Sequence, residues 1–276
     1  MKNKMKRVVV FSPSNFSLNT LCITALLHLK GVEVEAVIIR ELLSLKRIIF
    51  ELTKNGFSGL VRRIWIKVFL CAMAYDKQRV DNIASFKKEL GLKFNTVKQL
   101  GRYYGIPVIF CKDLNDDAAV SHLKKINPDA VIFTGGGLIR KKVLEYAGSG
   151  VINAHPGILA LYRGMDVTEW AILENRFDCL GFTIHFMDNG VDTGDILRTE
   201  KIELTGCENL KQYKDRIERT ACEEIVNTAI DYLDGLVERK PQKKEDGKQY
   251  FRMPYHLRKA AESSFASFQK LSIPSK

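Results

Sequence analysis

The sequence of 276 residues lacks the cysteine patterns of small disulfide-crosslinked proteins and of zinc-binding proteins. Its six cysteines are scattered at positions 22, 71, 111, 179, 207 and 222, and no two of them form a C-x-x-C pair. This distribution argues against a secreted disulfide scaffold and a zinc ribbon, and it is typical of reduced thiols in the cytosol. There is also no internal repeat and no long linker rich in proline, glycine or serine, so solenoid and disordered classes are excluded for most of the chain.

A membrane span and an export signal are also missing from the sequence. No stretch reaches about 18 uninterrupted apolar residues, the length that would predict a membrane-spanning helix. The basic start Met1–Arg7 resembles that of a signal peptide, but the apolar run Val8–Phe11 that follows is too short for an export core. We therefore expect a cytoplasmic protein in which residues 8–11 form a buried β-strand.

The chain has more positively charged than negatively charged side chains. The 43 Lys and Arg residues against 32 Asp and Glu give a formal net charge of +11, which favours an anionic partner or surface. Residues 41–100 alone hold 12 basic and 5 acidic side chains, a net charge of +7. We interpret residues 41–100 as a helical insertion with a solvated basic face. A basic lid over an anionic substrate, or a membrane-surface helix over residues 60–75, is the alternative.

Short apolar runs alternate with helical patterns along the first 155 residues. Strands are expected over 8–11, 34–39, 107–110, 130–133 and from 151, with helices over 18–30, 97–104 and 118–126. Continuous Val, Ile and Phe runs separated by helices are typical of a parallel sheet covered on both faces. The expected fold class is therefore α/β, with a doubly wound, mostly parallel sheet whose ligands bind beyond the carboxyl ends of the strands.

The polar residues most suggestive of chemistry lie between residues 133 and 197. Asn153 and His155 stand at the end of an expected strand, where side chains two apart share a face and point into one crevice. A second strand from Gly181 leads into a glycine-rich loop with three acids, Asp188-x-Gly190-x-Asp192-Thr193-Gly194-Asp195. This loop can bring a carboxylate beside His155. The spacing of its acids does not follow a calcium-binding loop, so no metal is expected.

Taken together, Asn153-x-His155, Tyr162-Arg163-Gly164 and the Asp188–Asp195 loop resemble the folate-dependent formyltransferase family. The resemblance covers about residues 105–205. The family includes methionyl-tRNA, glycinamide ribonucleotide and sugar N-formyltransferases. The resemblance implies a Rossmann-like formyltransferase fold, 10-formyltetrahydrofolate as formyl donor, and a primary amine as acceptor.

The resemblance implies that Asn153, His155 and Asp192 are the catalytic residues. An amine that attacks the formyl carbon creates a tetrahedral oxyanion, to which the Asn153 amide can donate a hydrogen bond. Because an imidazole ordinarily titrates near neutral pH, His155 can accept the amine proton and pass one to the leaving folate nitrogen. Asp192 can hold a cationic His155 or an ordered water. The structural alternatives are a turn-forming Asn153, a packed core His155 and an Asp192 that caps its turn.

The resemblance also implies contacts to donor and acceptor. The residues expected at the folate are Gly136, Gly137, Leu138, Ile139, Arg140, Asp188 and Val191. Consecutive glycines after a strand let the backbone approach a flat ring. A nucleotide phosphate loop is the competing interpretation, but the third glycine of the dinucleotide fingerprint is absent. The residues expected at the acceptor are Tyr162, Arg163, Gly164 and His185, the last of which suits a structural role equally well.

Three acceptors remain within the family. The loop after the first strand, Ser12–Phe16, has no glycine, which argues against the phosphate loop of glycinamide ribonucleotide enzymes. Methionyl-tRNA enzymes carry a C-terminal β-barrel, for which the 81 residues after Asp195 offer no room. The net charge of +11 is compatible with binding the phosphates of tRNA, so tRNA remains a less favoured alternative partner. We therefore expect a nucleotide-linked amino sugar as acceptor.

The expected organisation is one catalytic domain with a C-terminal extension. Residues 1–205 form the catalytic domain, including the insertion at 41–100. Residues 206–276 form a helix over 208–238 and a tail packed on that domain, with no separate barrel, and the polar stretch 259–276 is expected to fray. A homodimer is compatible with the sequence. The functional alternatives are a formyltetrahydrofolate hydrolase and a non-enzymatic protein that binds nucleic acid or a membrane surface.

Overall fold

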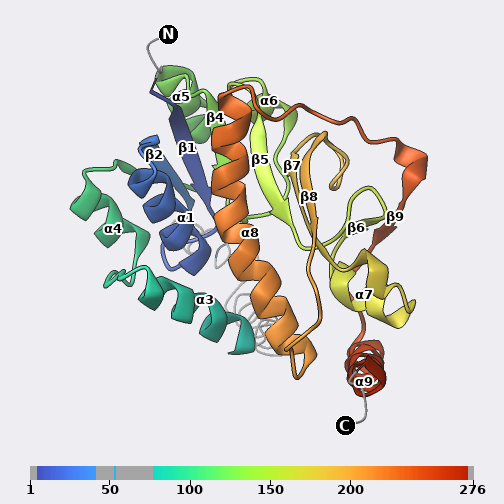
Figure 1. The fold of residues 1–276 in the computed structure, drawn as a ribbon. Coiled ribbons are helices and arrows are strands. Elements are labelled where there is room, and N and C mark those ends of the chain that lie inside the picture. Colours follow the sequence, from blue (N-terminus) through green and yellow to red (C-terminus); the bar gives the residue numbers. More distant parts are fainter. Residues whose placement is uncertain (1–4, 42–52, 54–76, 273–276) are drawn as a thin grey trace.

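The computed structural model describes residues 5–41, 53 and 77–272. A seven-stranded sheet with the order β3-β2-β1-β4-β5-β7-β8 lies at its centre (Figure 1). The strands are β1 (Arg7–Ser12), β2 (Glu33–Arg40), β3 (Val108–Cys111), β4 (Ala130–Phe133), β5 (Val151–His155), β7 (Gly181–Phe186) and β8 (Ile196–Lys201). The first five are parallel, and β7 and β8 join antiparallel at one edge. The expected mostly parallel α/β sheet is confirmed.

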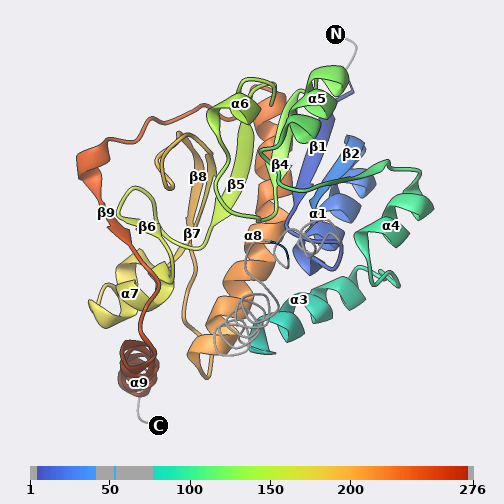
Figure 2. The same cartoon turned by 180° about the vertical axis from the view of Figure 1, so that it is seen from behind.

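Both faces of the sheet are buried, which explains its continuous apolar runs. Along β1, Val8 and Val10 belong to one hydrophobic core while Val9 and Phe11 belong to the other, because successive side chains of a strand point to opposite faces. The larger core is covered by α1 (Leu18–Leu29), α3 (Lys77–Glu89), α4 (Val97–Tyr104), α7 (Val167–Leu173) and α8 (Leu210–Leu233). The smaller core is covered by α5 (Asp117–Ile126) and α6 (Lys141–Leu144) (Figure 2).

The C-terminal part is more ordered than the sequence suggested. The expected long helix is α8, which ends at Leu233, two residues before Gly235 with its φ of +74°. The expected fraying is wrong for residues 259–272, which belong to α9 (Tyr255–Ser272). The reason is that Ala261 and Phe265, one helical turn apart, are both buried in the larger core. Residues 60–75 lie outside the described part of the chain.

Between α8 and α9 the chain returns along the edge of the sheet (Figure 2). We call residues 239–254 the strap. Lys240 pairs with Ile196, and β9 (Lys248–Tyr250) forms a small parallel sheet with β6 (Tyr162–Gly164). Two short 3-10 helices, η1 (Phe177–Cys179) and η2 (Lys244–Asp246), complete the elements of this region. None of the described helices is long and apolar enough to cross a membrane.

Candidate active site

The predicted catalytic residues meet where β5 pairs with β7. Asn153 on β5 stands opposite His185 on β7. The antiparallel β7 ends beside the start of β5, where the Met187 amide donates to the Val151 carbonyl, and the loop after it folds back toward His155. The Asp192 carboxylate in this loop lies 3.4 Å from His155 Nδ1 and 3.6 Å from His185 Nε2. Asn153 Nδ2 lies 3.1 Å from His185 Nε2. Two separate segments of the chain thus bring Asn153, His155 and Asp192 together, with His185 between Asn153 and Asp192.

The hydrogen bonds of His185 determine how the Asn153 amide is oriented. His185 Nδ1 lies 2.8 Å from the Phe186 carbonyl, which can only accept, so Nδ1 carries the hydrogen. Burial lowers the pKa of His185, although the Asp192 carboxylate acts in the opposite direction. The ring is therefore neutral, and its Nε2 accepts a hydrogen bond from the Asn153 amide. The second Nδ2 hydrogen of Asn153 is left for another acceptor.

His155 is oriented by a carbonyl on one side and faces a carboxylate on the other. Its Nε2 donates to the Tyr162 carbonyl at 2.8 Å, because a carbonyl can only accept, and its Nδ1 faces the Asp192 carboxylate. The side chain of His155 is 4% exposed and that of Asp192 is 16% exposed. Asp192 is therefore the more open member of the pair, and it also accepts a hydrogen bond from the Gly164 amide at 2.9 Å.

The loop that carries Asp192 is closed by its own side chains. Asp188 accepts hydrogen bonds from the Gly190 amide at 2.9 Å and from the Thr193 hydroxyl at 2.8 Å. Asp192 itself has a φ of +54°, a left-handed conformation that is unfavourable for a residue with a side chain. Asp188 thus stabilises the turn through these hydrogen bonds. Val191, the residue before Asp192, is half-buried.

The three glycines after β4 all adopt positive φ angles, +122°, +127° and +101° for Gly135, Gly136 and Gly137. A Cβ on Gly136 would lie 2.9 Å from Leu114 Cδ1, so a side chain there would clash as well as strain the backbone. Arg40 donates to the Gly136 carbonyl at 2.9 Å. Of the next three residues, Ile139 is buried, whereas Leu138 and Arg140 are exposed.

Tyr162 and Arg163 turn toward other parts of the chain. Tyr162 donates to Glu174 and stacks on Tyr250 of β9, and the buried Arg163 donates to the side chain of Gln242 in the strap. Within the Tyr162-Arg163-Gly164 motif, it is Gly164 that lines the cavity described next.

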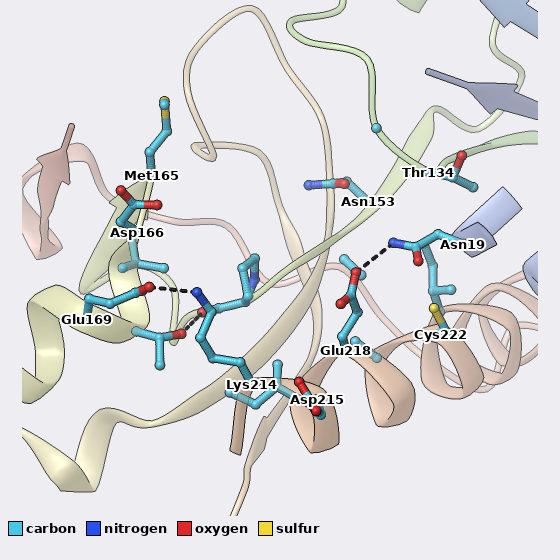
Figure 3. Close-up of a pocket in the computed structure, with 18 of the residues that line it drawn as sticks. Asn19, Thr134, Asn153, Met165, Asp166, Glu169, Lys214, Asp215, Glu218 and Cys222 are labelled. Carbon is cyan, nitrogen blue, oxygen red and sulfur yellow. Dashed lines mark hydrogen bonds and ion pairs between the residues drawn. The ribbon is translucent and has the colours of Figure 1, made fainter. Parts of the chain in front are cut away.

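A cavity of about 430 Å³ opens between α7, α8 and the carboxyl ends of β4 and β5 (Figure 3). Asn153 lines it, whereas His155 and Asp192 are not among its lining residues. Two ion pairs form part of its wall, Lys214 with Glu169 at 2.6 Å and Arg258 with Asp166 at 2.9 Å. Other polar lining residues are Asn19, Thr134, Thr168, Lys211, Asp215, Glu218 and Arg252.

Sequence reasoning missed the residues of this cavity outside the motif block. Asn19 donates to Glu218 at 3.1 Å across the cavity wall, joining α1 to α8. The lining positions of α8 are 211, 214, 215, 217, 218, 221, 222 and 225. They follow the three- and four-residue spacing of one helix face. The mixture of charged and apolar residues along that face was a signal available in the sequence, whereas Arg252 and Arg258 carried none.

Comparison with known proteins identifies the family. Residues 74–229, more than half of the chain, match the Formyl transferase family. The chain therefore belongs to this family, as the resemblance of its motifs indicated. No group of three or more metal-ligating side chains occurs among residues 5–41, 53 and 77–272.

Several curated proteins with similar sequences are methionyl-tRNA formyltransferases. The protein of Thermodesulfovibrio yellowstonii is 29% identical over 163 residues, which cover 55% of this chain and 53% of that protein. The protein of Syntrophus aciditrophicus is 33% identical over 164 residues, covering 55% and 52%. The chain thus spans about half the length of these curated relatives.

Solved structures share the fold at low sequence identity. Glycinamide ribonucleotide transformylase 1 from Symbiobacterium toebii has a TM-score of 0.55 at 16% identity, over 88% of this chain and 96% of that chain. A sugar N-formyltransferase from a Shewanella species has a TM-score of 0.57 at 14% identity, covering 95% and 88%. The N-formyltransferase from Helicobacter canadensis in complex with folinic acid and dTDP-3-aminofucose has a TM-score of 0.53 at 15% identity, covering 99% and 84%. The expected formyltransferase fold is confirmed.

Proposed function

We propose that this protein transfers a formyl group from 10-formyltetrahydrofolate to a primary amine on a nucleotide-linked amino sugar. The observation that carries the proposal is the position of Asn153, which lines the cavity while its amide is held by His185 beside the His155–Asp192 pair. Membership of the formyl transferase family supports the same reaction.

Asn153 supplies the stabilisation of the oxyanion. As the amine nitrogen bonds to the formyl carbon, the carbonyl oxygen becomes negative and accepts the Nδ2 hydrogen that His185 leaves free. Because this donor is already oriented before reaction, little reorganisation is needed, and a single donor of this kind contributes about 10²–10³-fold to the rate.

The His155–Asp192 pair moves the proton. Asp192, the more open of the two, lies 3.4 Å from His155 Nδ1, so a proton released by the attacking amine can reside on the pair as imidazolium and carboxylate. The bond between the formyl carbon and the folate nitrogen then breaks, and the pair returns the proton to that nitrogen. The products are a formamide and tetrahydrofolate, and no net charge is created.

The two sides of Asn153 suit the two substrates differently. The three glycines after β4 follow the carboxyl end of that strand, where ligands of such sheets bind, and their lack of side chains lets the backbone approach a flat pterin ring. We assign Gly136–Arg140, Asp188 and Val191 to that side. The cavity beyond Asn153 is assigned to the acceptor.

The charges of the cavity match a nucleotide-linked sugar. Among the described residues Lys211 and Arg252 line it without an ion-pair partner, and both can hold phosphate oxygens. Asp215 and Glu218 offer carboxylate oxygens to sugar hydroxyls. A cavity that carries both cations and acids favours a diphosphate sugar over a simple amine. The sugar N-formyltransferases among the solved structures agree with this assignment.

The direct test mixes purified protein with 10-formyltetrahydrofolate and a panel of amines containing dTDP-3-aminofucose, other nucleotide-linked amino sugars and methionyl-tRNA. We expect mass spectrometry to detect one added formyl group on a nucleotide sugar, with an equal amount of tetrahydrofolate released. Formylation of methionyl-tRNA alone would overturn the acceptor. Formate release without any amine would identify a hydrolase, and an unchanged donor would overturn the reaction.

A further inference from the structure

We propose that Gln242 in the strap is a positioning residue that holds Asp192 against His155. The proposal rests on the proposed function, because it takes the His155–Asp192 pair as the group that moves the proton. Gln242 lies outside residues 74–229, which match the formyl transferase family, so the match to the family assigns it no role.

The side-chain amide of Gln242 binds the main chain of the Asp192 loop at two points. Its Nε2 donates to the carbonyl of Asp192 at 3.2 Å and to the carbonyl of Gly194 at 2.5 Å. The two carbonyls belong to the residues before and after Thr193, so the two hydrogen bonds together fix the backbone conformation of the turn from Asp192 to Gly194. Gln242 thus binds the main-chain carbonyl of Asp192. The Asp192 side-chain carboxylate faces His155 and the Gly164 amide instead.

This support acts on a backbone conformation that is unfavourable by itself. Asp192 has a φ of +54°, and a strained residue keeps such a conformation only where its surroundings hold it. Gly194 is buried, and a Cβ there would lie 2.0 Å from the Phe186 carbonyl, so the turn fits closely against β7 on its other side. Without the two bonds from Gln242, the turn can relax, and the carboxylate moves with it.

Arg163 orients the Gln242 amide. The Gln242 Oε1 accepts from Arg163 Nε at 3.4 Å and from Nη2 at 3.2 Å, and an arginine can only donate. The NH₂ end of Gln242 must therefore point to the Asp192 loop. Arg163 is itself buried, and its Nη2 also donates to the Lys243 carbonyl at 2.8 Å. The buried guanidinium thus connects the Tyr162-Arg163-Gly164 motif through Gln242 to Asp192.

Three variants separate this role from simple support of the fold. Gln242→Met keeps the shape of the side chain but removes both its donor and its acceptor. Gln242→Glu keeps an acceptor for Arg163 but replaces the donor with a carboxylate oxygen that faces two carbonyls. Gln249→Met makes the same change at an exposed position of β9 in the same strap and serves as the matched control.

Two measurements are made on the full chain. The first is kcat and KM with 10-formyltetrahydrofolate and dTDP-3-aminofucose, with methionyl-tRNA as the second acceptor. The second is the hydrogen-exchange rate of the Gly164 amide by NMR, which needs no activity, because this amide donates to the Asp192 carboxylate. We expect Gln242→Met and Gln242→Glu to lower kcat by about 10–100-fold with KM nearly unchanged, since a displacement of about 1 Å can cost 10²-fold. We expect both to accelerate exchange at Gly164.

The outcomes divide clearly. Faster exchange at the Gly164 amide in both Gln242 variants, but not in Gln249→Met, supports the positioning role. If the wild-type protein formylates neither acceptor, this exchange result still supports the positioning role, and only the proposed function fails. Unchanged exchange and kcat in a folded Gln242→Met protein overturn the positioning role. Full activity of Gln242→Glu also overturns it, because the contact to Arg163 would then be sufficient.

Discussion

Asn153 and His185 face each other across the β5–β7 pair, and the amide of one donates to the ring nitrogen of the other at 3.1 Å. The sequence separates them by 32 residues. Their contact determines the direction in which the Asn153 amide points, because the buried His185 ring accepts one of its two hydrogens.

Replacing Asn153 by alanine removes the donor that we assign to the oxyanion. We expect kcat to fall by about 10²–10³-fold, the usual effect of losing one preorganised donor. KM for both substrates should change little, because the hydrogen bond forms mainly in the transition state. Steady-state kinetics with the acceptor found in the panel checks this, and a loss expressed mainly in KM would contradict the assignment.

Asp192→Asn tests the proton-transfer pair without changing the size of the side chain. An amide at this position no longer stabilises an imidazolium at His155, so kcat should fall by about 10²–10⁴-fold, the range of general acid–base catalysis. Thermal unfolding monitored by circular dichroism should show a stable fold. Activity near that of the wild type in a folded variant would exclude the carboxylate from the reaction.

The buried His185 should make the stability of the protein depend on pH. Burial lowers its pKa in the folded state, so below the ordinary histidine value of about 6.5 the unfolded chain binds a proton that the folded chain does not. The free energy of unfolding should therefore decrease as the pH falls from about 7 to about 5.5, and this decrease should be smaller in His185→Gln. Urea unfolding at the two pH values measures it. The exposed His256→Gln is the control, and equal decreases in wild type and His185→Gln would contradict the prediction.

Removing the cations of the cavity should weaken acceptor binding more than catalysis. For Arg252→Ala and Lys211→Ala we expect a higher KM for a nucleotide-linked sugar, by about 10-fold if a charge-assisted hydrogen bond of 1.5–3 kcal/mol is lost, with kcat little changed. The increase should be smaller at high salt, which screens the exposed Arg252 and, to a lesser extent, the half-buried Lys211. The exposed Lys259→Ala on α9, whose residue does not line the cavity, provides a control.

The C-terminal helix should contribute to the stability of the whole protein. Phe265 is 1% exposed and belongs to the larger hydrophobic core, so Phe265→Ala should lower the free energy of unfolding by about 3–5 kcal/mol. The exposed Ser263→Ala on the same helix should have little effect. Denaturant titration compares them, and a small loss for Phe265→Ala would mean that α9 is not an integral part of the fold.

Much of the fold was predictable from local patterns. The continuous apolar runs at residues 8–11 and 130–133 became β1 and β4 because both faces of a parallel sheet are buried. The predictions failed or were silent where long-range contacts decide. The tail expected to fray is held in α9 by Phe265, and the return of the strap to Tyr162-Arg163-Gly164 depends on a pairing between segments more than 80 residues apart. Spacing along the chain contains no signal for such pairings.

The residues of the site divide in the same way. The sequence by itself determined which groups are available: an amide and an imidazole two residues apart on a strand, and a turn rich in glycine and aspartate that must fold back. The tertiary structure alone decided their partners. Only in the folded chain does His185 become the support of Asn153, does Gln242 reach Asp192, and do α8 and the strap enclose a charged cavity, because side-chain hydrogen bonds depend on distances of a few ångströms between segments that the order of residues does not specify.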